Sequence, residues 1–402
     1  MKTYVVVAAA TWFALAACAS AQIAVSANDG KQLRPGDDPP GIRPDTVATI
    51  DLSVSPPKIL AKIDAPASMI GPPDSVAVSP DSSFAIVTCS QKPDPSNPEK
   101  PLLADTVSVI DIANPSKPHV TQTVAAGDGA SGVSMNAKAT MALVANTSGS
   151  VSVFTIAHKK LTKIDTIQLE PGSGPTDVVF GRHGKHAYVV ERGGNRIDIL
   201  DVDGKKVTNS GQSIVTGRGP YGMSITPDGK FGIDTNLGGA MEEHPEPPPA
   251  EAGAPGGRRR RGPPRAGTIT LVDLATDKVV DSAVVGPTPE HVDLSPNGKY
   301  AEVTVANDSA LPPTSPRFSS VHGLMLVYGV NDGKLTKIAS ADTGHWCQGA
   351  VWNSDSSEIL LQCATERDIE VYRFDGATLS LEPSATLKFN ARPGAIATSS
   401  NQ

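Results

Sequence analysis

The stretch Met223–Phe231, with the sequence MSITPDGKF, decides the fold of this chain. A short strand is followed by a Pro-Asp-Gly turn and the start of a second strand. Pro presets φ for the turn and Gly supplies a positive φ, so the stretch predicts a β-hairpin. Two further copies are VAVSPDSSF at Val76–Phe84 and VDLSPNGKY at Val292–Tyr300.

A second repeated pattern is an alternating strand that ends in Asp. It occurs at Asp45–Asp51, Asp105–Asp111, Asn195–Asp201 and Gly267–Asp273. Alternation with period two and β-branched residues is typical of a half-buried strand. No segment has a sustained helical period, so we expect an all-β protein.

The spacing of the turns predicts the architecture. Turns begin at Ser79, Asn136, Gly181, Thr226, Ser295, Asn353 and Thr398. The gaps from Asn136 to Gly181, from Gly181 to Thr226 and from Asn353 to Thr398 are each 45 residues. A unit of this length with four short strands is a propeller blade. We therefore expect a seven-bladed β-propeller with four antiparallel strands in each blade.

The two ends of the repeat array complement each other. Residues 398–402 match the start of a turn, and Gln22–Ser26 match the strand that follows such a turn. We expect the last blade to combine one C-terminal strand, Gly394–Thr398, with three N-terminal strands, which removes an open sheet edge. Gln22 and Gln402 should then lie close together on the face that carries the Pro-Asp-Gly turns.

These repeats resemble the YVTN family of β-propellers, within the lactonase-like seven-bladed superfamily. The resemblance lies in the repeated strand, SPDGK turn, AYV and (D/N)TVSVID unit, of which His186–Val190 with Asn195–Asp198 is a close copy. It covers the chain from Gln22 onward and implies the fold more strongly than the function.

The first residues predict export. Lys2, the apolar run Val5–Ala17 and an A-x-A site before Gln22 indicate a secretory signal peptide over residues 1–21. Leu15–Cys18 also resembles a lipoprotein box, so lipidation of Cys18 is the alternative to cleavage after Ala21. Either route places the chain in the periplasm or outside the cell, where disulfides are permitted. We expect no transmembrane segment and a single propeller domain over residues 22–402.

Composition argues against a nucleic-acid partner. The formal net charge is −7 and aromatic residues make up 4% of the chain. A polyanion partner favours a basic surface, and base stacking needs aromatic side chains.

Extra residues fall between the second and third strands of four blades. They occupy residues 28–44, 90–104, 237–266 and 307–322. Such loops share one face with the links that lead into the inner strands, and clustered insertions are typical of a binding face. The insertion at 237–266 is rich in Pro, Gly and Arg, so we expect a flexible solvated loop, with an anion-binding arm as the alternative.

The links that lead into the inner strands predict a ligand site at the channel mouth. They carry Asp74, Asp177, Arg218, Tyr221, Glu290, His291, His345, Trp346, Gln348 and Arg392. The alternative is that these residues only cap and hydrogen-bond the loops. His345 and Trp346 would suit a sugar or planar ligand, with core packing of Trp346 as the alternative.

The resemblance to lactonases also implies catalytic residues. Lactonase-family propellers similarly place an Arg-His pair before one strand and an Asn-Glu pair after the next. Here His291 and Asn307 fit, Glu290 replaces the Arg, and Asp308 replaces the Glu. His291 would be the general base and Asp308 its partner, while Arg218 or Arg392 would supply the missing cation for the oxyanion.

The cysteines and the absent motifs complete the predictions. Cys347 and Cys363 lie at opposed positions of one hairpin and should form a disulfide, leaving Cys89 free. CxxC, HExxH and CxxCH motifs are absent from the sequence, so we expect no metal and no cofactor.

The sequence leaves three functions open. The first is an exported propeller, expected to be a monomer, that binds a small molecule or an envelope protein through its insertion-rich face. The second is a lactone hydrolase similar to the 6-phosphogluconolactonases. The third is a structural cell-surface protein.

Overall fold

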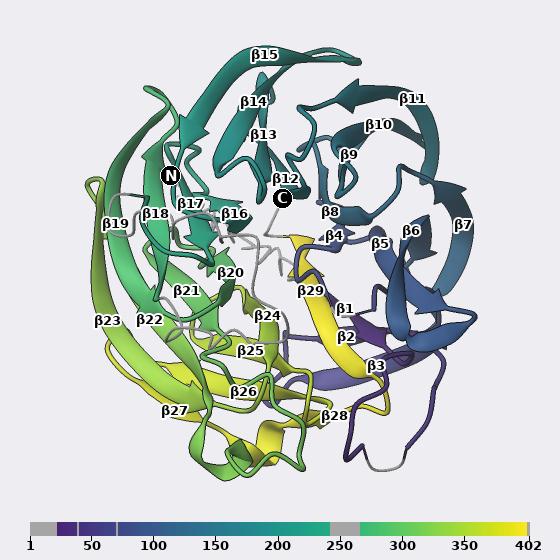
Figure 1. The fold of residues 1–402 in the computed structure, drawn as a ribbon, viewed down its shortest axis with the longest axis vertical. Helices are drawn as coiled ribbons and strands as arrows, with labels where there is room; N and C mark the ends of the chain where they lie inside the picture. The colour runs from purple at the N-terminus through teal and green to yellow at the C-terminus, as the bar shows by residue number, and fades with distance from the viewer. Residues whose placement is uncertain (1–21, 38–39, 70, 242–265, 400–402) are drawn as a thin grey trace, which may run out of the picture.

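The computed structural model describes residues 22–37, 40–69, 71–241 and 266–399. Seven antiparallel sheets in this part of the chain are arranged as a ring (Figure 1). The all-β seven-bladed propeller predicted from the repeats is therefore confirmed. The expected signal peptide, Cys18 and Gln402 lie outside the described residues.

The strands of each blade follow one another from the channel outward. Blade one consists of β4 (Val76–Val78), β5 (Phe84–Asp94), β6 (Asn97–Asp111) and β7 (His119–Ala125). Blade two consists of β8 (Ala130–Met135), β9 (Met141–Asn146), β10 (Ser150–Ala157) and β11 (Lys160–Gln168). Blade three consists of β12 (Pro175–Phe180), β13 (His186–Glu191), β14 (Arg196–Asp203) and β15 (Lys206–Val215). Blade four consists of β16 (Pro220–Ile225), β17 (Phe231–Asn236), β18 (Gly267–Asp273) and β19 (Lys278–Gly286). Blade five consists of β20 (Pro289–Leu294), β21 (Tyr300–Val305), β22 (Gly323–Asn331) and β23 (Lys334–Thr343).

Blade six is built from β24 (Cys347–Trp352), β25 (Glu358–Cys363) and β26 (Asp368–Phe374). Its outer position is divided between β27 (Leu379–Leu381) and β28 (Leu387–Lys388), which both pair with β26. Two short 3₁₀ turns, η1 (Phe318–Ser320) and η2 (Pro383–Ala385), complete the elements of the described chain.

Blade seven closes the ring with both ends of the chain. Its strands are β29 (Arg392–Thr398), β1 (Ile23–Asp29), β2 (Thr46–Asp51) and β3 (Lys58–Asp64). Ala24 pairs with Thr398 and Ala27 pairs with Ala395. The predicted closure of the last blade by N- and C-terminal strands is therefore confirmed.

The Pro-Asp-Gly turns have a shared hydrogen-bond pattern. The Ser79 hydroxyl donates to Asp81 and accepts the backbone N–H of Phe84, which begins the next strand. Thr226 and Ser295 accept the equivalent N–H groups in blades four and five. The side chain that precedes Pro thus satisfies a donor that the turn would otherwise leave unpaired.

The core consists of seven apolar layers, each between two neighbouring blades. One layer joins Val25 of blade seven to Val87 of blade one, and another joins Ile50 of blade seven to Val371 of blade six. The remaining layers join each successive pair of blades. Every sheet is therefore buried on two faces, which explains why the inner strands are almost wholly apolar.

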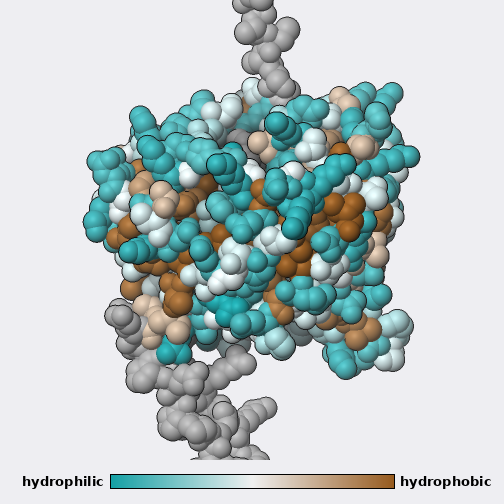
Figure 2. Space-filling model, turned by 90° about the horizontal axis from the view of Figure 1, so that it is seen from above, coloured by the Kyte–Doolittle hydropathy of each residue, from teal (hydrophilic) through white to brown (hydrophobic). Residues whose placement is uncertain are grey.

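The insertions differ from one another in structure. Residues 90–104, expected as a loop, instead extend β5 and β6 into a longer hairpin in which Pro93 faces Pro101. Residues 242–265 of the Arg-rich insertion lie outside the described part. Seen from the side, apolar side chains gather around the waist of the molecule between more hydrophilic rims (Figure 2). None of the helices in the described residues is long and apolar enough to cross a membrane.

Candidate functional site

The inner strands surround a narrow central channel. A cavity of about 50 Å³ in it is lined by residues of the inner strands, including Asp177, His291 and Asp293, and by Asp74 of the link that leads into β4. That volume holds only a few water molecules, because one water needs roughly 10–15 Å³. A larger ligand therefore does not fit inside this cavity.

The insertions lie beside one mouth of the channel. Each inner strand runs antiparallel to the second strand of its blade, so its first residue faces the last residue of that strand. Pro289 faces Val305, for example, and Cys347 faces Cys363. The insertions follow these second strands, and so they lie on the same side as the links that lead into the inner strands.

His291 is buried in the channel wall between two carboxylates. Its Nε2 lies 3.4 Å from Asp74 Oδ1, and its Nδ1 lies 3.9 Å from Glu302 Oε2. Burial alone would lower the pKa of His291, but the hydrogen bonds and charges of Asp74 and Glu302 outweigh it and raise the pKa to about 10. His291 Nδ1 also accepts the N–H of Ala350 at 3.3 Å. Both ring nitrogens are thus engaged, Nε2 with Asp74 and Nδ1 with Ala350, which does not suit His291 to act as a general base toward water.

Asp177 joins two further blades beside this pair. It accepts the N–H of Met223 at 3.1 Å and that of Val178 at 2.7 Å. Burial, and then the charge of Asp74, raise the pKa of Asp177 well above its usual value. Glycine is needed opposite both carboxylates, since a Cβ at Gly132 would lie 2.4 Å from Asp177 Oδ1 and one at Gly222 would lie 2.5 Å from Asp74 Oδ2.

Three blades bring a second polar group to the mouth. Glu290 is the second residue of β20, Tyr221 is the second residue of β16, and Arg192 follows β13. The guanidinium carbon of Arg192 lies 5.6 Å from the centre of the Tyr221 ring. Burial raises the pKa of Glu290 to about 7, although the charge of Arg192 opposes the rise. Burial, and then Glu290, raise the pKa of Tyr221, so its hydroxyl remains a donor.

Arg218 and Asp308 lie in loops on the same face. The Arg218 backbone pairs with Gly239 and Gly238 at the start of the Arg-rich insertion. Asp308 is half-buried, with a φ of 59°, directly after Asn307, whose side chain donates to the His322 carbonyl. The two carboxylates that pair with His291 within the described residues are Asp74 and Glu302.

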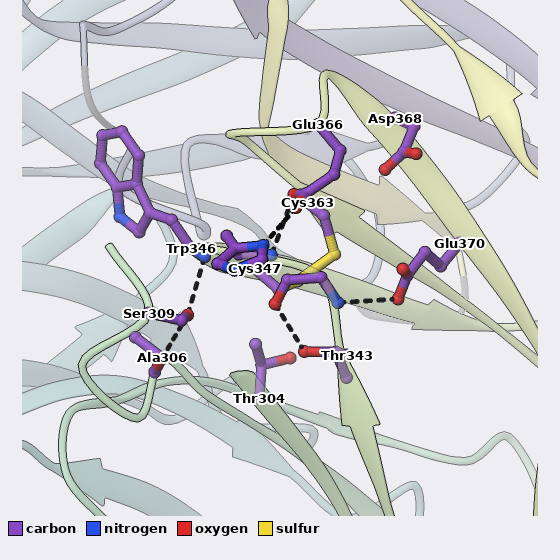
Figure 3. Close-up of a disulfide and its surroundings, with 12 residues drawn as sticks. Thr304, Ala306, Ser309, Thr343, Trp346, Cys347, Cys363, Glu366, Asp368 and Glu370 are labelled. Atoms are coloured by element: carbon purple, nitrogen blue, oxygen red, sulfur yellow. Dashed lines mark hydrogen bonds and ion pairs between the residues drawn. A yellow bond between two sulfur atoms is a disulfide. The ribbon is translucent and has the colours of Figure 1, made fainter. Parts of the chain in front are cut away.

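His345 and Trp346 are held by their surroundings. The His345 ring stacks on Phe318 at 3.7 Å and bonds Glu366 through Nδ1 at 2.5 Å. Trp346 is 7% exposed and lies beneath the guanidinium of Arg34, whose carbon is 4.5 Å from the ring centre. Figure 3 shows Glu366 near the Cys347–Cys363 bridge, with Trp346 pointing to the other side.

Gln348 and Arg392 are also buried near blade six. With its amide oriented to satisfy both ends, Gln348 donates to the Gly394 carbonyl at 3.2 Å and accepts from the Trp346 indole at 2.9 Å. Arg392 donates to the Ala364 carbonyl at 2.9 Å and pairs with Asp37 of the insertion at residues 28–44. The structure thus divides the predicted residues into a channel group and a group beneath two insertions.

Cys347 and Cys363 are joined by a disulfide that fastens the start of β24 to the end of β25 (Figure 3). Cys89 is a buried free thiol, and burial raises its pKa to about 11. Cys347, Cys363 and Glu370 form the one close group of metal-binding atoms within the described ranges. Both sulfur atoms of that group are in the bridge, so they do not offer thiolate ligands.

Sequence reasoning missed Arg192, Glu302, Arg34 and Asp37. Glu302 had a signal, because a carboxylate within the nearly continuous apolar run Ala301–Val305 indicates a strand buried on both faces, where the charge needs a partner. Arg192, in the loop after β13, carried no such signal.

Comparison with known proteins agrees with this architecture. A family model described as lactonase, 7-bladed beta-propeller, matches residues 102–233. A periplasmic gluconolactonase from Pseudomonas aeruginosa superimposes with a TM-score of 0.68 at 12% identity, over 94% of this chain and 99% of that one. A putative 6-phosphogluconolactonase from Bacteroides fragilis gives 0.66 at 15% identity, over 95% and 99%. The search of curated proteins finds no match. The predicted resemblance to lactonase-like seven-bladed propellers is confirmed.

Proposed function

We propose that this chain, a seven-bladed β-propeller similar to the lactonase family, hydrolyses lactones at the mouth of its central channel. The observation that carries the proposal is the half-buried Glu290 carboxyl group. Its pKa lies near 7, and Arg192 and Tyr221 from two neighbouring blades lie beside it. A base with a pKa close to the working pH combines a useful ionised fraction with a strong affinity for the proton.

The chemistry follows from these three side chains. Glu290 takes a proton from water as the water oxygen bonds to the lactone carbonyl carbon. The Arg192 guanidinium and the Tyr221 hydroxyl donate to the developing oxyanion. The ring C–O bond then breaks, and the proton held by Glu290 passes to the leaving alkoxide. The product is a hydroxy acid, and no co-reactant besides water is required.

His291 acts as a positioning residue in this scheme. It is buried in the channel wall and pairs with Asp74 through Nε2. Its Nδ1 accepts the Ala350 N–H, so neither ring nitrogen is available to take a proton from water.

A panel of five- and six-membered lactones tests the proposal. We expect the purified protein to hydrolyse at least one of them, with kcat/KM rising through an inflection near pH 7. Glu290→Gln should lower kcat/KM by about 10² or more and remove the inflection. Asp308→Asn, a second carboxylate on the same face, is the matched control and should retain the inflection. Binding without turnover would favour a ligand-binding propeller instead.

Export is a second part of the proposal. It is supported by the apolar segment Val5–Ala17 and by the buried disulfide, a bond that persists in oxidising compartments. A fusion to a reporter that is active only outside the cytoplasm should be active, and deleting residues 1–21 should abolish that activity. Labelling with a radioactive fatty acid, compared with Cys18→Ser, distinguishes a lipid anchor from cleavage after Ala21.

A further inference from the structure

A second cavity lies away from the channel, between two insertions. We call it the arginine groove. It is lined by Asp37 and Arg43 of the insertion at residues 28–44, Pro313 of the insertion at residues 307–322, Arg367, and Phe389 with Asn390. Its volume is about 540 Å³, within the range of about 300–1,000 Å³ that is usual for small-molecule sites. The channel cavity is about one tenth of this size.

The two insertions are fastened to each other beside the groove. Arg34 donates to the Ala310 carbonyl at 2.9 Å and to the Thr365 hydroxyl at 3.2 Å, while its guanidinium stacks on Trp346. These contacts join the insertion at residues 28–44 to the insertion at residues 307–322 and to blade six. The walls of the groove are therefore held in place before any ligand binds.

Positive charge exceeds negative charge in and behind the groove. The guanidinium groups of Arg43 and Arg367 line it, and those of Arg34 and Arg392 lie behind it. The carboxylates there, among the described residues, are Asp37, which pairs with both Arg392 and Arg367, Glu366, which bonds His345, and Asp29, which lies opposite Arg392 in the sheet of blade seven. Four cations thus face three carboxylates in this part of the described chain, in a protein whose formal net charge is −7.

The titration of this cluster agrees with a surplus of positive charge. Burial, and then repulsion from Arg392, lower the pKa of Arg34 to about 10. Burial raises the pKa of Asp37, but the hydrogen bond and charge of Arg392, together with Arg34 and Arg367, outweigh burial and lower that pKa. The positive charge of the neighbouring guanidinium groups, which disfavours the charged form of Arg34, would stabilise an added anion.

The remaining lining suits a ligand with a carbon skeleton. The Phe389 ring and Pro313 supply apolar surface at the groove, while the Asn390 side chain adds a polar group. A bare inorganic ion would leave most of the volume and the apolar surface unused. Guanidinium groups favour carboxylates and phosphates because two N–H donors can bind two oxygens.

We propose that the arginine groove binds a small organic anion, with its carboxylate or phosphate on Arg43 and Arg367 and its carbon skeleton against Phe389 and Pro313. This site is separate from the Glu290 group and does not depend on lactone hydrolysis. A carboxylate and a phosphate would make the same contacts with the guanidinium groups. Probes that share a hexose ring and differ only in the anionic group distinguish the two.

Isothermal titration calorimetry with glucuronate, glucose 6-phosphate and glucose tests the groove. We expect at least one charged probe to bind and neutral glucose not to bind. Arg43→Gln and Arg367→Gln should each weaken that binding about tenfold or more, as loss of a charge-assisted contact does. Arg317→Gln, which changes an exposed arginine of the neighbouring insertion, is the matched control and should bind as the parent protein does.

Three results would overturn the groove assignment: no binding of either charged probe at millimolar concentration, equal binding of glucose, or binding that survives both groove substitutions. Arg367 pairs with Asp37, so circular dichroism must show that its variant is folded, and Arg43→Gln carries the test if it is not. Glu290→Gln should bind the charged probes unchanged. Failure of lactone hydrolysis and failure of the groove can therefore be told apart.

Discussion

The Asp74 carboxylate extends across the central channel from blade one and lies 3.4 Å from the His291 imidazole of blade five. It also lies against Gly222 of blade four, where a Cβ would come within 2.5 Å of Asp74 Oδ2. Asp177 of blade three, with its bond to the Met223 N–H, ties the next pair of blades together. Polar contacts thus link the inner strands across the channel, in addition to the apolar layers between neighbouring blades.

His291→Gln should destabilise the fold more than it impairs chemistry. The substitution removes the imidazole that pairs with Asp74 and lies beside the fully buried Glu302, and breaking a buried pair costs about 3–5 kcal/mol. Urea unfolding measures this loss. The inflection of kcat/KM near pH 7 should persist in the folded variant. If His291→Gln instead removes the inflection without loss of stability, then His291 is the base and the role given to Glu290 is wrong.

Arg192→Gln should lower kcat by about 10²–10³, because it removes a donor to the oxyanion. Lactone turnover under saturating substrate measures the effect. Arg218→Gln, the alternative that the sequence suggested, should change kcat by less than tenfold. The reverse order of the two effects would assign the oxyanion cation to Arg218.

Replacing both Cys347 and Cys363 by Ser should lower the free energy of unfolding by about 3 kcal/mol, because the bridge closes a short loop and restricts the unfolded chain. Urea unfolding of the oxidised parent and the double variant gives the difference. Thiol titration of the unfolded, unreduced protein that begins at Gln22 should detect one reactive thiol, that of Cys89. Three reactive thiols would mean that the bridge does not form.

Asp234→Asn should increase stability above pH 7. Asp234 is fully buried in β17, and burial raises its pKa to about 7 against the opposing effect of Thr216, Asn236 and Thr270. The folded state therefore holds the proton more tightly than the unfolded state, so this contribution is complete below about pH 4 and is lost as the pH rises through 7.

The raised pKa sets the size of the effect. A shift from 3.8 to about 7 corresponds to at most ~4 kcal/mol, so the neutral amide should gain about 1 kcal/mol or more over Asp234 at pH 8. Little difference is expected at pH 4. Melting temperatures measured at both pH values compare the two proteins. A variant that is less stable than the parent at pH 8 would show that the carboxylate itself is needed there.

Local patterns predicted the fold because each blade repeats the same turn. Thr226 and Ser295 occupy equivalent places, and the strand alternation shows which residues face the neighbouring sheets. The closure of blade seven was also predictable, since the two ends of the chain supply complementary parts of one repeat. The hairpin at residues 90–104 was not, because its Pro-rich sequence lacks the alternation that marks a strand.

The site was less predictable because its contacts cross between blades. The pairing of Asp74 with His291, the position of Arg192 over Tyr221 and the stacking of Arg34 on Trp346 join segments that are distant in sequence. Their distances depend on how the ring closes, and no repeat pattern records them. Sequence alone therefore named most residues of the mouth but not their partners.

The pairing of β1 with β29 has a consequence for the order of events during synthesis. The first strand of the propeller has no partner on its inner side until the last strand has been made. A nascent chain must keep β1 and its sheet edge open while six blades are completed, and edges of this kind pair readily with other chains. A chain stopped before Arg392 would never close its ring. We therefore expect premature termination near the end to yield an aggregating product rather than a slightly shortened propeller.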